Sequence, residues 1–218
     1  MSGETTVTKK ELTAALEKTL GDRGERNFTE SVEVVITTEG FDVSKPENRI
    51  RQTIVLPNPT PKTRKVCIFA EGIIKDAAEK AGADRVIDTR ELDSVAQNRK
   101  EVKKIGKAYD FFLAEARLMG KVGKIMGFTL GPKGKAPAVI TPTTDLTKEI
   151  GDLKRAVRLY LRNRPEAACA IGQASMTPDK LAENASMIIS SFRETLGKRG
   201  RLGHIYVKTT MGKPVRVA

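Results

Sequence analysis

The spacing of apolar residues in the first part of the chain predicts one helix and two strands. Four apolar residues recur at helical intervals within residues 9–20: Leu12, Ala15, Leu16 and Leu20. Residues 31–38 and 51–56 instead alternate apolar and polar positions, as half-buried strands do. The proline-containing residues 58–61 end the second strand. A helix followed by two antiparallel strands is the beginning of an α+β layer.

Between residues 65 and 140 the pattern changes to alternating strands and helices. Strands are expected at 66–70, 86–87, 109–114 and 139–140. Helices are expected between them at 72–81, 91–107 and 115–126. Such alternation is typical of a mostly parallel sheet with helices on its faces, so it predicts a Rossmann-like, three-layer α/β fold.

The last part of the chain returns to an α+β pattern. Its expected elements are helices at 146–162 and 178–196 and strands at 167–172 and 204–209. An α/β segment between two α+β segments indicates an insertion, with both chain ends folded together. We therefore expect a split α+β domain of residues 1–61 and 154–218, and an inserted α/β domain of residues 62–153.

The chain is basic, and the excess charge is concentrated near its C-terminal end. Lys and Arg number 39 against 27 Asp and Glu in 218 residues, a net charge of +12. Residues 1–61 carry 8 basic and 10 acidic side chains, residues 62–153 carry 18 and 13, and residues 154–218 carry 13 and 4. This balance favours a polyanionic partner, nucleic acid first and an anionic membrane second. A solvated basic face explains the charge alone equally well.

Several classes of protein are disfavoured by what the sequence lacks. No run approaches the roughly 18 apolar residues of a membrane span, and the first residues show no secretory signal. Cys67 and Cys169 each lie in an apolar run, which predicts buried, reduced thiols in a cytosolic protein. His204 is the single histidine, so no zinc site of Cys and His is expected. We expect no metal and no cofactor.

The glycine-rich residues 127–138 do not match a nucleotide-binding loop. No Gly-Lys pair has the P-loop spacing, and neither Ser nor Thr follows Lys135. We interpret the segment as a mobile basic loop in which Lys133 and Lys135 are candidate secondary contacts to phosphate. No nucleophile motif accompanies His204, which disfavours catalysis. The remaining enzymatic alternative is a phosphate-ester enzyme with one of these lysines at its substrate.

Residues 208–216 combine the end of a strand with groups that suit RNA. Thr209 and Thr210 can form hydrogen bonds to 2′-hydroxyls or phosphates, and Met211 can lie on an exposed base. Gly212 has no Cβ to keep another backbone away. Positive charge is added by Lys208, Lys213 and Arg216. An ordinary strand followed by a turn fits these residues as well.

Four stretches that together extend along nearly the whole chain resemble the L1 family of ribosomal proteins. They are residues 28–34 (FTESVEV), 123–137 (GKIMGFTLGPKGKAP), 172–184 (GQASMTPDKLAEN) and 209–216 (TTMGKPVR). Three features depart from the family pattern: the inserted pair Phe128 and Thr129, His204 in place of a small hydroxyl residue, and Asn27 in place of a basic residue. The length and the ending resemble archaeal or eukaryotic members more than bacterial ones.

The resemblance implies a cytoplasmic, non-enzymatic constituent of the large ribosomal subunit. It would bind the rRNA junction of the mobile stalk on the tRNA-exit side, aid release of deacylated tRNA and repress translation of its own mRNA. Carried over by position, the recognition core would be Thr210, Met211 and Gly212. The same surface would be completed by Phe28, Glu30, Ser31 and Ser175. The alternative of the same class is a translational repressor or RNA chaperone that acts off the ribosome.

Overall fold

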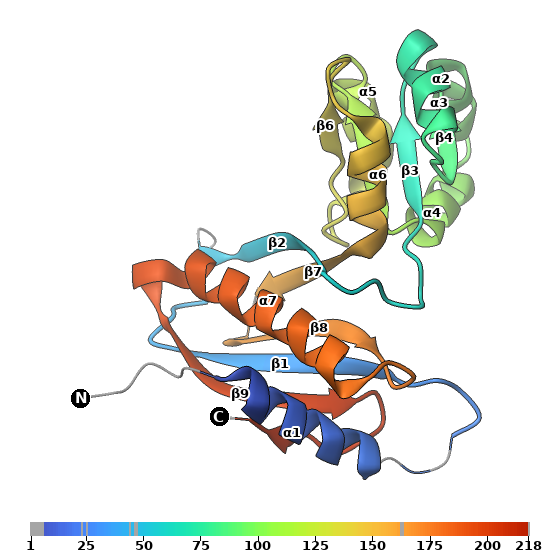
Figure 1. Cartoon of the computed structure of the whole chain (residues 1–218). Coiled ribbons are helices and arrows are strands. Elements are labelled where there is room, and N and C mark those ends of the chain that lie inside the picture. Colours follow the sequence, from blue (N-terminus) through green and yellow to red (C-terminus); the bar gives the residue numbers. More distant parts are fainter. Residues whose placement is uncertain are drawn as a thin grey trace. The chain divides into compact units, whose positions relative to one another are not determined.

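The computed structural model describes residues 7–22, 24, 26–43, 45, 48–161 and 164–217. The chain divides into two compact units. One, the terminal unit, consists of Met1–Lys62 together with Arg155–Ala218, and the other, the central unit, is Thr63–Lys154. Figure 1 shows the elements of both. The terminal unit therefore brings the two ends of the chain into one structure.

The terminal unit is built on a four-stranded antiparallel sheet with the strand order β10-β9-β1-β8. Its strands are β1 (Ser31–Glu39), β8 (Glu166–Gln173), β9 (Arg201–Thr209) and β10 (Val215–Arg216). In the centre, Val34 of β1 is opposite Cys169 of β8 and Val207 of β9. Side chains of β1 alternate between buried and half-buried, so one face of this sheet forms core.

Two helices, α1 (Lys9–Gly21) and α7 (Pro178–Leu196), pack side by side on that sheet (Figure 1). A capping box starts α1, since the Glu11 amide donates to Thr8 Oγ1 at 3.4 Å and the Thr8 amide donates to Glu11 Oε2 at 2.8 Å. Pro178 stands in the first turn of α7, where its fixed φ suits a helix. A 3₁₀ turn, η2 (Gly197–Arg199), follows α7.

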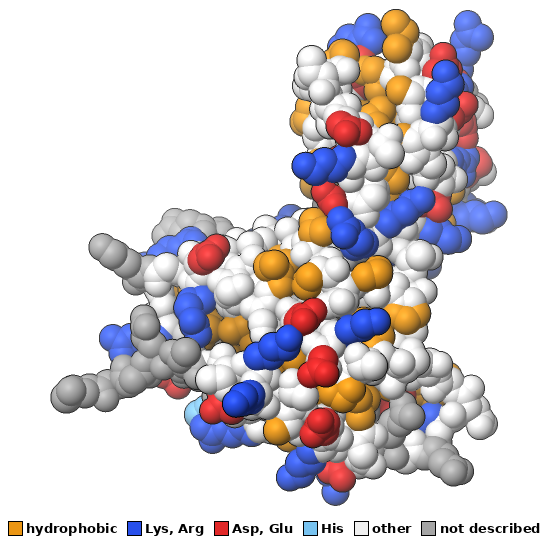
Figure 2. Space-filling view, viewed as in Figure 1, with side chains coloured by type: hydrophobic (Ala, Val, Ile, Leu, Met, Phe, Trp, Pro, Cys, Tyr) orange, Lys and Arg blue, Asp and Glu red, His pale blue; other side chains and the backbone are white. Residues whose placement is uncertain are grey.

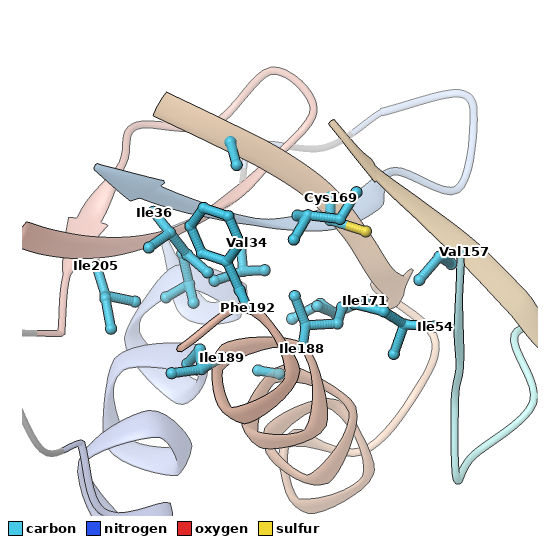
Figure 3. Packing of buried hydrophobic residues seen from close by; sticks show 14 of the residues in the cluster. Val34, Ile36, Ile54, Val157, Cys169, Ile171, Ile188, Ile189, Phe192 and Ile205 are labelled. Atoms are coloured by element: carbon cyan, nitrogen blue, oxygen red, sulfur yellow. The ribbon is translucent and has the colours of Figure 1, made fainter. Parts of the chain in front are cut away.

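The core of the terminal unit lies between these helices and the strands (Figure 3). Phe192 of α7 is fully buried in one cluster with Val34 and Ile36 of β1. Burial of each such side chain contributes about 1.5–3 kcal/mol to stability. The sequence spacing of α7 predicts this helix with its bounds, because its apolar residues recur at helical intervals throughout.

Two further strands, β2 (Ile50–Val55) and β7 (Ala156–Leu161), form a separate antiparallel pair in the terminal unit. The expectation that residues 31–38 and 51–56 are neighbouring antiparallel strands is therefore wrong. Both sides of β1 are occupied, by β8 and β9, and β2 pairs with a strand that the sequence analysis assigned to a helix.

The expected helix at 146–162 is wrong beyond residue 155. The structure has α6 (Leu146–Arg155) followed directly by β7. Val157 and Leu161 are four residues apart, which fits a helix face, but with buried Leu159 between them they also form one face of a strand. Pairing with β2 decides between the two, because it supplies partners for the backbone of residues 156–161.

The central unit contains a four-stranded sheet in the order β4-β3-β5-β6, in which every neighbouring pair is parallel. Its strands are β3 (Val66–Phe69), β4 (Arg85–Ile87), β5 (Phe111–Glu115) and β6 (Ala138–Ile140). The helices that connect them are α2 (Gly72–Lys80), α3 (Thr89–Ala96), α4 (Arg99–Ala108) and α5 (Met119–Leu130). The predicted mixture of helix and strand and the predicted parallel sheet are confirmed.

Two helices of the central unit differ from the sequence prediction. The expected helix at 91–107 is interrupted, because Asn98 caps α4 by accepting from the Lys100 amide at 3.1 Å. The expected helix at 115–126 begins later and ends at Leu130, so the first residues of the expected mobile loop are helical. The buried stripe of Val122, Met126 and Leu130 at four-residue intervals outweighs the glycines within α5.

Both cysteines are buried, as the sequence predicts, and neither forms a disulfide. Cys67 lies in the fully buried strand β3. Burial disfavours the thiolate and raises the pKa of the Cys67 thiol to about 12. At neutral pH this thiol is therefore protonated and acts as a small apolar side chain.

We propose that the two units are domains, each able to fold alone. Residues 63–154 expressed as a separate chain are expected to unfold in one cooperative step, because their sheet and helices enclose a core of their own that includes Phe69 and Phe112. Calorimetry tests this by comparing the calorimetric and van't Hoff enthalpies, which should agree. A fragment with no heat-absorption peak would show that the central unit depends on the rest of the chain.

Candidate nucleic-acid interface

A closed turn follows β9 and presents Met211 to solvent. Thr209, the last residue of β9, is fully buried, and its Oγ1 accepts from the Gly212 amide at 3.1 Å. A Cβ on residue 212 would stand 2.4 Å from this Oγ1, so the turn requires glycine. Met211, between them, has 63% of its surface exposed. The turn thus holds an apolar side chain in water.

Thr210, which belongs to the same turn, is hydrogen-bonded to Ser31, the first residue of β1. The Thr210 amide donates to the Ser31 carbonyl at 3.0 Å. The Thr210 hydroxyl donates to the same carbonyl at 3.2 Å. In return, the Ser31 amide donates to the Thr210 hydroxyl oxygen at 3.1 Å. Two residues that the resemblance assigned to one surface are therefore in direct contact, although 179 positions separate them.

Glu30 joins three segments of the chain. Its side chain is only 3% exposed, and Oε1 accepts from the Met211 amide at 2.9 Å. Its carbonyl accepts from the Ala174 amide at 2.9 Å, in the turn between β8 and α7. A hydrogen bond from a backbone amide to a carboxylate is stronger than one between neutral groups. Glu30 therefore fixes the turn that carries Met211, from inside the protein.

A depression of about 880 Å³ lies beside this junction. It is lined by residues of two segments: Gly24, Arg26, Asn27, Phe28, Thr29, Glu30, Ala174 and Ser175. Phe28 is 56% exposed at its edge, and Ser175 is also exposed. Arg26 also lines the depression and was not among the predicted contacts; its signal in the sequence is a basic residue two positions before Phe28.

We call the exposed residues around this junction the terminal surface: Arg26, Phe28, Ser175, Thr210, Met211 and Lys213. Lys208 approaches it from β9, where its ammonium group donates to the Thr210 carbonyl at 3.2 Å. His204 is exposed further back on β9, with its ring edge-on to Tyr206 at 6.3 Å between centroids. The terminal surface combines two apolar side chains, two hydroxyls and two cations.

Lys133 and Lys135 belong to the central unit and have partners there. Both ammonium groups donate to the Gly106 carbonyl at 3.3 Å, and Lys135 also donates to the Tyr109 carbonyl. These carbonyls lie at the C-terminal end of α4, where positive charge is favourable. The two lysines therefore stabilise the end of a helix.

Charges of both signs occur over α1 and α7 of the terminal unit (Figure 2). Lys9 of α1 and Glu183 of α7, for example, form an ion pair at 2.9 Å. Within the described ranges, no group of three or more His, Cys, Asp and Glu residues is placed to hold a metal ion. None of the helices described has the length and apolar character needed to cross a membrane.

Replacing Glu30 with Ala removes the acceptor of the Met211 amide. Hydrogen exchange at that amide is expected to become at least about tenfold faster, because a hydrogen bond to a charged group contributes about 1.5–3 kcal/mol. The Thr210 amide, which donates to Ser31, is expected to change less. NMR exchange rates on the folded protein measure both. Glu33→Ala, on the half-buried side of β1, is the control, and equal Met211 exchange in both variants would contradict the assigned contact.

Comparison with known proteins bears on the identity of this chain. Residues 15–213 match the model of the ribosomal protein L1p/L10e family. The large ribosomal subunit protein uL1 of Methanocella arvoryzae is 39% identical, over 97% of this chain and all of the relative. That of Aeropyrum pernix is 40% identical, over all of this chain and 98% of the relative. That of Thermofilum pendens is 39% identical, over all of this chain and 97% of the relative.

These matches confirm the resemblance seen in the four motifs, and the relatives are archaeal, as the length and the ending suggest. The family is one of ribosomal proteins, so the expectation that the chain is not an enzyme is confirmed. The alternative of a phosphate-ester enzyme is therefore wrong. With both chain ends interlocked at one surface and a match over nearly its whole length, the chain belongs to the ribosomal protein L1p/L10e family.

Proposed function

We propose that this protein is a constituent of the large ribosomal subunit in the cytoplasm and that its terminal surface binds rRNA at the junction of the stalk on the tRNA-exit side. Relatives that match its full length are named as large-subunit proteins. The observation that carries the proposal is the exposure of Phe28 and Met211 on a junction that Glu30 holds in place.

The chemistry of the terminal surface suits RNA whose bases are unstacked. Phe28 offers a ring face on which a base can stack, and Met211 offers a second exposed apolar contact. The Ser175 hydroxyl can exchange hydrogen bonds with 2′-hydroxyls, the groups that distinguish RNA from DNA. Lys213 and Arg26 can pair with phosphates.

Rigidity is the second argument for this surface. The turn of residues 209–212 is closed by bonds between Thr209 and Gly212, and it is tied to β1 through Thr210 and to Glu30 through Met211. A preorganised surface loses little conformational entropy on binding. It therefore favours an RNA of one shape over others that carry the same charge.

Charge gives the protein a general attraction to RNA besides this recognition. The net charge is +12, and residues 154–218 carry 13 basic against 4 acidic side chains. Contacts between such side chains and phosphates release counterions, so their contribution falls steeply as salt rises. Binding that persists at high salt would then come from the terminal surface.

Two finer roles belong to the same proposal. The protein aids release of deacylated tRNA as part of the stalk, and it represses its own mRNA by binding an RNA fold similar to the rRNA junction. A single surface for both RNAs means that an rRNA junction fragment and such an mRNA fragment compete. In the alternative, an off-ribosome repressor, the protein would leave large subunits when they are sedimented through high salt.

Removing the two exposed apolar side chains tests the proposal. The double variant Phe28→Ala with Met211→Ala is expected to bind an rRNA stalk-junction fragment at least about tenfold more weakly, since stacking of one base on an aromatic ring contributes about 1–3 kcal/mol. Neither side chain is buried, so the fold should remain. Fluorescence anisotropy with labelled RNA measures the affinity, and circular dichroism checks the fold.

The chain offers a matched control for this experiment. Phe128 and Met187 are exposed to 41% and 42% and lie outside the terminal surface. Phe128→Ala with Met187→Ala removes the same chemical groups and should leave the affinity for the junction within about twofold. Equal losses in both double variants, or no loss in either, would contradict the assignment of the terminal surface.

A further inference from the structure

The central unit has a crevice at the carboxyl edge of its parallel sheet. Strands β3, β5 and β6 all end there, and the chain crosses from β4 on one side of β3 to β5 on the other. Open α/β sheets bind ligands at this kind of reversal in strand order. The crevice measures about 800 Å³, comparable to established ligand sites.

The usual anion position at such an edge is already occupied. The turn from β3 to α2 passes through Gly72, whose φ of 53° lies in the left-handed region that favours glycine. The N-terminus of α2 would attract a phosphate here. Instead, the buried Glu115 places its carboxylate at this point and accepts from the Glu71 amide at 3.4 Å. The same carboxylate accepts from Arg117 Nε at 2.6 Å.

The charge of the crevice is opposite to that of the protein as a whole. Three acidic residues line it, Glu71, Glu115 and Asp145, against the single cation Arg117, which is paired with Glu115. The protein carries +12 overall. Like charges disfavour a phosphate or a carboxylate ligand in this crevice, and a cation is favoured.

Most of the other lining residues are apolar, beside three threonines, and apolar surface continues outside the crevice. Ile74, Ile140 and Leu146 contribute to its wall. Ile73, at its rim on α2, is 88% exposed, the most exposed of the large apolar side chains described. In Figure 2, apolar side chains appear on the surface at the end of the central unit toward which β3 points in Figure 1. Apolar surface of this kind marks a contact with a partner.

We propose that this crevice is a docking site for a segment of another protein in which aliphatic side chains alternate with Lys or Arg. The aliphatic groups enter the crevice and cover Ile73, while the cations face Glu71 and Asp145. This site lies in the central unit and goes beyond the proposed rRNA binding by the terminal surface.

The neighbouring strand favours a peptide over a small cation. β6 is the last strand in the order of its sheet, and its residues Ala138 and Val139 are exposed. An extended segment can hydrogen-bond to such an edge while alternate side chains point into the adjoining pocket. Ile140 and Thr141, at the end of this strand, already line the crevice. A small molecule inside the crevice would leave Ile73 and this edge uncovered.

The experiment uses the full-length, isotope-labelled protein and the synthetic peptide Lys-Leu-Lys-Val-Lys-Leu-Lys. Titration followed by NMR is expected to shift amide signals of residues 71–77, 115–117 and 140–147, which bound the crevice. A peptide with Glu at every Lys position should cause none of these shifts. A protein of net charge +12 repels a cationic peptide in general, so binding at this place requires a local cause.

Variants locate the contact. Ile73→Ser removes the apolar side chain without adding charge and should weaken binding of the basic peptide at least about tenfold. Glu71→Lys should also weaken it, most strongly at low salt. Met187→Ser makes a matching change at an exposed apolar position of the terminal unit and should have no effect. Affinity of the junction RNA should be unchanged in Ile73→Ser, so failure of this site and failure of the proposed rRNA binding are told apart.

Several results would overturn the proposal. They are shifts outside the crevice, equal binding by Ile73→Ser, equal binding of the acidic peptide or of inorganic phosphate, and binding of hexylamine as tight as that of the peptide. Concentration-dependent dimers that disappear in Ile73→Ser would identify a second copy of this chain as the occupant instead. Binding limited to the basic peptide and weakened in Ile73→Ser is the result that supports it.

Discussion

The hydrogen bond from the Met211 amide to the buried carboxylate of Glu30 is the contact on which the terminal surface depends. It joins residues 181 positions apart, one just before the first strand and one after the last long strand. Because Glu30 is only 3% exposed, its carboxylate has exchanged water for this donor. Without this donor the Glu30 carboxylate would be buried and unsatisfied, so the bond holds the two segments together.

This hydrogen bond explains how the terminal surface keeps apolar side chains exposed to water rather than folded against the protein. Met211 is exposed because the backbone of its turn is fixed by Thr209, Thr210 and Glu30. In the central unit, Glu115 has a related place, as a buried carboxylate that accepts from a backbone amide beside an exposed apolar residue. Its negative charge there disfavours phosphate at the position that nucleotide-binding sheets use.

Segments whose apolar spacing fits only a helix or only a strand were predictable, and segments that fit both were not. The apolar spacing of α1 and α7 fits a helix, and the short apolar runs of β3 and β5 are too short for a helix and fit buried strands. Residues 156–161 satisfy both helix and strand spacing, and only their pairing with β2 decides. β10 has two residues, too few for any pattern. The break between α3 and α4 was also missed, because the apolar spacing continues across it and the side chain of Asn98 caps a new helix there.

The grouping of Phe28, Glu30, Ser31 and Ser175 with residues 209–212 came from family resemblance, since no local pattern brings distant segments together. The resemblance did not reveal that Glu30 is buried or that Lys133 and Lys135 bond to the end of α4, because burial and bonding depend on tertiary packing. Arg26 was missed for a related reason, since its place at the depression follows from the path of residues 26–30.

The most direct test of the account is equilibrium binding of the protein to an rRNA stalk-junction fragment and to a duplex of the same length, over a range of salt concentrations. The account predicts that duplex binding collapses as salt rises, because it depends on the +12 charge. Junction binding should keep a salt-independent part supplied by the terminal surface. Equal affinities for both RNAs with the same salt dependence would contradict shaped recognition.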